Sequence, residues 1–125
     1  MFPLSVTTGR LPTGEMPEMP VEPHEILEGE PNARGLIVGR SADKTAAAGF
    51  WSCNPGRYEF LFDYDEFLYL LEGEVTVTES GPRGRSMTLK DGDTACFPMG
   101  IKTTWHIHRK LTKYFVARSL SPMEL

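Results

Sequence analysis

The sequence predicts one all-β domain, a barrel or sandwich of short antiparallel strands that follows an irregular arm. Short runs rich in β-branched and aromatic residues recur from Gly35 onward, and turn signals separate them. Glu74–Thr78 alternates polar and apolar residues, as a strand with one solvated face does. No run keeps a helical apolar period over the roughly ten residues that a helix needs. The length of 125 residues suits a single domain with a real core.

The first segment, residues 1–31, differs from the rest in composition. It holds six prolines and several glutamates, and it shows neither a helical nor a strand period. Proline lacks a backbone donor and fixes φ, so such a segment can lie extended but cannot occupy the middle of a sheet. We therefore expect a proline-rich arm over residues 1–31 and a β-barrel domain over residues 32–125. The arm either packs on the barrel or reaches a second copy.

Strand-like runs fill the rest of the chain. Their boundaries follow turn signals at Asn54–Gly56, Glu72-Gly73, Ser80–Pro82, Asp91-Gly92 and Pro98–Gly100. The predicted strands are Leu36–Arg40, Ala47–Cys53, Tyr58–Asp63, Phe67–Leu71, Glu74–Glu79, Ser86–Leu89, Thr94–Phe97, Thr103–His108 and Lys113–Arg118.

The run Phe67–Leu71 is apolar on both faces, so neither face is expected to meet water. One face can fill the barrel, and the other needs cover from the arm or from a partner subunit. Wide exposed apolar patches usually mark contacts between molecules. We therefore predict a homodimer that uses this strand.

The charge balance argues against several partners. The formal net charge is −4, and the scattered basic residues form no stripe for nucleic acid. The densest basic group, Arg109, Lys110 and Lys113, is expected along one solvated strand edge. No apolar stretch approaches the roughly 20 residues that cross a bilayer, so no membrane partner is expected.

The start of the chain and the cysteines suggest a cytoplasmic protein. Met1–Arg10 lacks the charged start and apolar run of a signal peptide. Cys53 and Cys96 have no metal-type spacing, and we expect both to be buried thiols that act as small hydrophobic residues.

Four segments together carry a resemblance to a known family: Trp51–Gly56, Asp65–Gly73, Gly92–Gly100 and Thr104-Trp105. They resemble the cupin superfamily, and more narrowly the small single-domain cupins of the ureidoglycine aminohydrolase-like type. The resemblance covers roughly residues 50–116. It implies an RmlC-like jelly-roll barrel that is often dimeric.

The family's metal ligands are largely missing here. Glu66 is followed by six residues and then Gly73, as in the first cupin motif. The two histidine positions of that motif hold Phe60 and Phe62, or Glu59 and Leu61 in the alternative spacing. Thr103 and Ile107 hold the histidine and asparagine positions of the second motif, so Glu66 alone remains of the four usual ligands.

We therefore predict no metal and no cofactor, because a catalytic divalent ion generally needs at least three protein ligands. The alternative is one divalent metal held by Glu59 and Glu66 with an added histidine. Side chains alternate along a strand, so His106 and His108 are expected on the face opposite Thr103, away from the barrel interior. His24 in the arm is expected to be solvated.

The predicted ligand-binding pocket lies inside the barrel, and Glu66 is its candidate general acid or base. An isolated carboxyl in an apolar barrel would favour its protonated form, whereas backbone donors or an arginine would make it a structural anchor. Aromatic walls favour a flat or partly apolar ligand with one polar group. The predicted lining residues are Trp51, Phe60, Phe62, Glu66, Thr103 and Trp105.

Three functions are consistent with this reading. The first is a metal-free cupin-like protein that binds a small metabolite, and its specific function cannot be read from the sequence. The second is a cupin hydrolase or isomerase, resembling ureidoglycine aminohydrolase, that acts on a small nitrogen-containing or carbohydrate compound. The third is a structural or regulatory dimer without catalysis.

Overall fold

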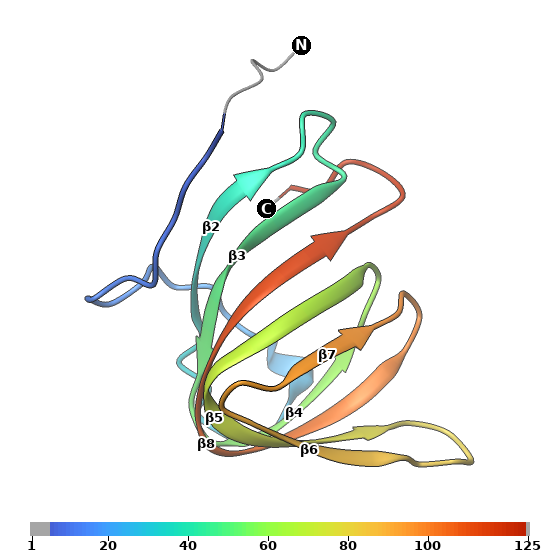
Figure 1. The fold of residues 1–125 in the computed structure, drawn as a ribbon. Coiled ribbons are helices and arrows are strands. Elements are labelled where there is room, and N and C mark those ends of the chain that lie inside the picture. Colours follow the sequence, from blue (N-terminus) through green and yellow to red (C-terminus); the bar gives the residue numbers. More distant parts are fainter. Residues whose placement is uncertain (1–5, 125) are drawn as a thin grey trace.

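The computed structural model describes residues 6–124 and confirms the all-β, jelly-roll type of fold (Figure 1). These residues form an eight-stranded antiparallel sheet. A short 3-10 helix, Pro23–Glu25, precedes the first strand, and no helix in the described part of the chain could span a bilayer. The strands are β1 (Ile26–Gly29), β2 (Arg34–Arg40), β3 (Ala46–Cys53), β4 (Gly56–Leu61), β5 (Asp65–Glu79), β6 (Ser86–Lys90), β7 (Thr94–Phe97) and β8 (Lys102–Arg118).

The two longest strands, β5 and β8, pair with each other at the centre of the sheet. They pair along almost their whole length, from Asp65↔Arg118 to Glu79↔Thr103. The other edge of β8 pairs with β4 in its first half and with β3 in its second half. The other edge of β5 pairs with β7 and then β6, so both long strands curve from one wall of the barrel into the next (Figure 1).

The predicted turn at Glu72-Gly73 was wrong, because β5 continues through it. The register of the β5–β8 pair shifts between Leu70 and Val75, which is the mark of a bulge. Gly73 has φ +122, and a Cβ there would lie 2.8 Å from the Cα of Leu111. The glycine therefore allows the two strands to approach and bend rather than ending one of them.

The predicted break between Thr103–His108 and Lys113–Arg118 was also wrong, since both runs belong to β8. The remaining predicted strands agree with the structure to within two residues at each end. The edge strand β1 was not predicted, because its four residues, Ile26–Gly29, follow the prolines and are mostly exposed.

The N-terminal arm packs on the barrel. The Met19 amide donates to the Ala33 carbonyl, and the Gly35 amide donates to the Pro17 carbonyl, both at 3.0 Å. Met16 and Val21 are buried. The described part of the arm therefore runs beside β2, as its course in Figure 1 also shows.

The outward face at the start of β5 is apolar and exposed. Phe67 and Tyr69 keep 49% and 43% of their surface accessible. With Cys96, Tyr114 and Val116 they line a shallow depression. Since the described arm lies beside β2, a second copy of the chain remains the predicted cover for this face.

We expect the protein to behave as a dimer of 14.0 kDa chains when its molar mass is measured by light scattering. Tyr69→Glu should yield a monomer, because a carboxylate buried in an apolar interface is strongly unfavourable. Leu27→Glu, on exposed β1, is the matched control and should leave the mass unchanged. A wild-type protein that is monomeric at micromolar concentration would contradict the prediction.

Candidate functional site

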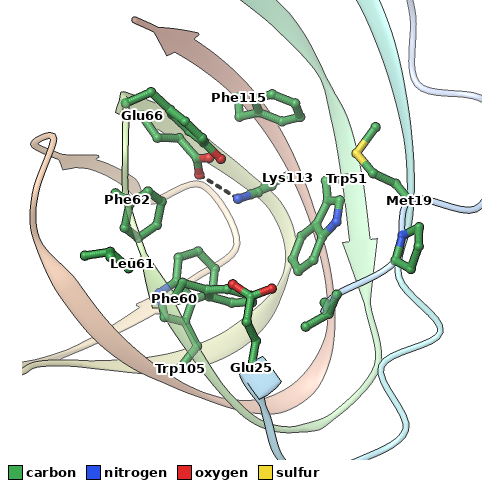
Figure 2. A pocket seen from close by; sticks show the side chains of 13 residues that line it. Met19, Glu25, Trp51, Phe60, Leu61, Phe62, Glu66, Trp105, Lys113 and Phe115 are labelled. Carbon is green, nitrogen blue, oxygen red and sulfur yellow. Dashed lines mark hydrogen bonds and ion pairs between the residues drawn. The ribbon is translucent and has the colours of Figure 1, made fainter. Parts of the chain in front are cut away.

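The barrel contains a cavity of about 250 Å³, closed on one side by the N-terminal arm. Strands β3, β4, β5 and β8 and the connection between β4 and β5 supply most of its side chains, and the arm adds Met19 to Val21 and Glu25 (Figure 2). The lining residues are Met19, Pro20, Val21, Glu25, Trp51, Phe60, Leu61, Phe62, Tyr64, Glu66, Trp105, Lys113 and Phe115.

Aromatic rings form much of the wall. Phe60 meets Trp105 edge to face, with ring centroids 5.4 Å apart, and Trp51 in the same manner at 6.2 Å. Such edge-to-face contacts are favourable because the positive ring edge faces the negative ring face. The rings therefore hold one another in place and leave a rigid apolar surface toward the cavity.

A buried ion pair lies in this aromatic cavity. Lys113 Nζ lies 2.5 Å from Glu66 Oε2, and the two side chains are 8% and 3% exposed (Figure 2). The ammonium also lies 4.8 Å from the centroid of the Trp51 ring and 4.9 Å from that of Trp105. Both distances are in the range of cation–π attraction. The Lys113 ammonium is thus neutralised by the Glu66 carboxylate and attracted by the two ring faces.

The expected position of Lys113 on a solvated edge was therefore wrong. Lys113 is buried, whereas Arg109 and Lys110 are exposed as predicted. Trp105 and Ile107 face the interior of β8; after an irregular stretch in which Arg109 is exposed, Leu111 and Lys113 face the interior as well. Alternation alone would also have placed Arg109 inside, so the sequence carried only part of this signal.

Strand register explains why Glu66 and Lys113 meet. Lys113 pairs with Trp51 on β3 and with Leu70 on β5. Glu66 lies four residues before Leu70, on the same face of β5, and its side chain points toward Lys113 (Figure 2). The pair thus joins adjacent strands across the inside of the barrel.

The structure brings together five of the predicted pocket residues: Trp51, Phe60, Phe62, Glu66 and Trp105. Thr103 is completely buried and does not line the cavity. Its Oγ1 accepts a hydrogen bond from Trp105 Nε1 at 3.0 Å and donates one to the Phe60 carbonyl at 3.3 Å. Thr103 therefore supports the aromatic wall, and the ligand-binding role of the other five residues stays a prediction.

Two further polar residues line the cavity although the predicted lining did not include them. Tyr64 follows β4, and burial, with added repulsion from Glu66, raises the pKa of its hydroxyl well above the ordinary value. Glu25, on the 3-10 helix, points its carboxylate toward the cavity (Figure 2). The sequence offered no signal for Glu25, because its position depends on how the arm folds back.

The residues around Glu66 do not fit a divalent metal ion. The Lys113 ammonium already pairs with this carboxylate and would repel a cation. Glu59 does not line the cavity but pairs with Lys102 at 3.1 Å. Within residues 6–124, no three side chains of the histidine, cysteine or acidic types are close enough to share an ion.

The histidines lie where the alternation predicts. His106 and His108 are on the outer face of β8, with ring centroids 4.1 Å apart, and His24 is exposed. His108 Nε2 lies 2.8 Å from Thr76 Oγ1. Partial desolvation, helped by His108, lowers the pKa of His106. The outward facing of both β8 histidines is thus confirmed.

The two cysteines differ from each other. Cys53 is fully buried, as predicted, and burial raises the pKa of its thiol to about 11. The prediction for Cys96 was wrong, because it is exposed on the face that also carries Phe67 and Tyr69. The next residue on β7, Phe97, faces the interior, and Cys96 therefore faces outward.

A curved antiparallel barrel with an internal cavity lined from β3, β4, β5 and β8 is the architecture of the cupin class. The chain belongs to the EutQ-like cupin domain family, whose model matches residues 40–115. No curated protein matches the sequence significantly.

Solved structures support this assignment. Ethanolamine utilization protein Q from Salmonella typhimurium LT2 is 25% identical; the match covers 69% of this chain and 68% of that one, with a TM-score of 0.59. A DUF861 family protein from Thermotoga maritima is 27% identical over 53% of this chain and 73% of its own, with a TM-score of 0.50.

A third structure shows the fold alone. It is a protein of unknown function from Pseudomonas syringae pv. tomato that belongs to the DUF861 family. Its sequence is 22% identical to this chain, and the TM-score is 0.73. The match covers 91% of this chain but only 45% of that protein, so this chain spans less than half of its length.

We expect Lys113→Met to destabilise the protein by about 3 kcal/mol, because it leaves the Glu66 carboxylate buried without a partner. Replacing both partners, Lys113→Met with Glu66→Leu, should recover most of that loss. The free energy of unfolding in urea measures both effects. Lys110→Met, an exposed site on the same strand, is the control and should change stability by less than about 0.5 kcal/mol. If Lys113→Met and Lys110→Met lowered the free energy of unfolding equally, the assigned role of the ion pair would be contradicted.

Proposed function

We propose that this cupin binds a small molecule in the aromatic cavity, with the polar group of the ligand held at the Glu66–Lys113 pair. The observation that carries the proposal is a buried ion pair facing open space instead of packed side chains. Concave, mostly apolar sites with a few convergent polar groups are typical of ligand pockets.

The pair can satisfy both a donor and an acceptor of the ligand. In the described part of the chain, Glu66 Oε2 takes the only hydrogen bond to this carboxylate, and Oε1 has no protein donor. Lys113 carries three donors, of which the structure engages one with a protein acceptor. A compact, flat molecule that bears an amide, a ureido group or a similar donor–acceptor pair fits this arrangement.

A second candidate is an enzyme of the ureidoglycine aminohydrolase-like type. Two points favour it. Glu66 holds the glutamate position of the first cupin motif, and nitrogen-rich ligand groups suit the Glu66–Lys113 pair. The position of Glu59 outside the cavity disfavours a two-glutamate metal centre. A purely structural or regulatory dimer would leave the cavity without a ligand.

Ligand binding can be followed through the two tryptophans of the chain, since Trp51 and Trp105 both line the cavity. We expect compact aromatic amides and ureas, with benzamide as the first probe, to change tryptophan emission and to raise the melting temperature. Bound ligand raises stability in proportion to the logarithm of its concentration over Kd.

The matched control uses two enlargements of apolar side chains. Val21→Phe fills part of the cavity and should abolish the emission change, whereas Leu27→Phe enlarges an exposed residue outside it and should not. If Val21→Phe responded like the wild type, the ligand would be binding elsewhere and the proposal would fail.

We expect purified protein to carry less than about 0.1 equivalent of manganese, iron, nickel or zinc by elemental analysis, because such ions need at least three protein ligands. Dialysis against a chelator should leave ligand binding unchanged. Stoichiometric metal that resists dialysis, and is lost in Glu66→Gln, would overturn the proposed metal-free site in favour of the enzyme.

A further inference from the structure

Lys113 has the surroundings of a lysine that could react. Its amine lies in an apolar cavity, beside one carboxylate and two indole rings, and 5.6 Å from the centroid of the Phe115 ring. A surface lysine is solvated on all sides, as the exposed Lys110 is. A lysine in an apolar pocket can act as a nucleophile when a neighbouring group takes its proton.

We propose that Lys113 captures the carbonyl carbon of a small aldehyde or ketone as an imine, with Glu66 as its proton partner. The inference rests on the proposed binding function, since it needs the cavity to admit a small molecule. It names the chemical class of that molecule as a compact carbonyl compound with an apolar body.

The step balances within the pair. Lys113 gives one proton to Glu66, and the neutral amine attacks the carbonyl carbon to form a carbinolamine. The Glu66 carboxylic acid then returns its proton to the departing hydroxyl group, which leaves as water. The products are a protonated imine on Lys113, the Glu66 carboxylate and one water molecule, so charge and atoms are conserved.

The same contacts would stabilise the product. The protonated imine keeps the positive charge of the ammonium near the same atoms, so Glu66 still neutralises it at short range. The Trp51 and Trp105 faces continue to attract that charge. The apolar body of the ligand replaces water against Phe60 and Phe62. At every stage the two adjacent groups are either both neutral or oppositely charged. No isolated charge is therefore left in the apolar cavity.

Other lining groups add selectivity for a carbonyl compound. The Tyr64 hydroxyl lines the cavity, and no protein hydrogen bond engages it in the described chain. It can donate to the carbonyl oxygen and polarise it. Glu25 at the arm side places a negative charge at the wall, which disfavours ligands that carry a second anionic group.

Reductive trapping tests the inference. Folded protein is incubated with benzaldehyde and cyanoborohydride, which reduces an imine to a stable benzylamine, and the modified lysines are located by peptide mass spectrometry. The chain has four other lysines as internal references: Lys44, Lys90, Lys102 and Lys110. We expect Lys113 to be labelled at least tenfold faster than Lys110, and this preference should disappear in urea.

The Glu66→Gln variant keeps the shape of the side chain but cannot accept the proton, and it should slow labelling of Lys113 at least tenfold without changing the rate at Lys110. Folding of the variant is checked by its circular dichroism spectrum. Should it not fold, benzamide added to the wild type replaces it, and occupation of the cavity should protect Lys113 alone.

Labelling confined to the exposed lysines, or an equal rate at Lys113 and Lys110, would overturn the inference. The binding proposal would survive that result if benzamide still changed tryptophan emission in the wild type and not in Val21→Phe. Failure of both measurements would remove the cavity as a binding site altogether.

Discussion

The Glu66–Lys113 ion pair is the interaction on which the interior of this barrel depends. Burying either charge alone is costly, because a low-dielectric interior disfavours an ion without a partner. Together, and with the indole faces of Trp51 and Trp105 around the ammonium, the two charges form a neutral polar centre inside an apolar wall. Such a pair adds little net stability compared with packed apolar residues. We propose that its position beside open space reflects ligand binding rather than folding.

The pair stands where the cupin resemblance would place a metal ligand. Glu66 is the one residue of the expected ligand set that the sequence keeps, and the structure gives it an organic cation as its partner. Phe60 and Phe62, at the histidine positions, line the same cavity and make it apolar. The cavity thus holds an ammonium–carboxylate pair and aromatic rings at the positions where the resemblance implies metal ligands.

The bulge at Gly73 determines which residues share the interior. Glu66, Leu68 and Leu70 face inward on the first half of β5, whereas Val75 and Val77 do so after the bulge. The inward positions change from even to odd across the irregular pairing with β8 between Leu70 and Val75. This shift leaves Phe67 and Tyr69 on the outer face, where they expose an apolar surface.

The N-terminal arm completes the cavity. Val21 and Glu25 contribute to its wall although they lie far from the motifs that identified the fold. The arm can do this because its prolines keep it extended, and its backbone bonds to Ala33 and Gly35 attach it beside β2.

Local pattern was enough to predict the all-β fold and most strand positions, and the cupin resemblance added the aromatic interior around Glu66 and the outward facing of His106 and His108. These features depend on neighbours in sequence, because alternation and glycine or proline signals act over a few residues. Long-range register decided the rest. The sequence could not show whether Gly73 ends a strand or bends it, since either use suits glycine. The sequence also carried no sign that Thr103–His108 and Lys113–Arg118 form the single strand β8. Only the pairing of β8 with β3 and β5 brought the Lys113 amine to Glu66, because contact between residues 47 positions apart depends on how whole strands align.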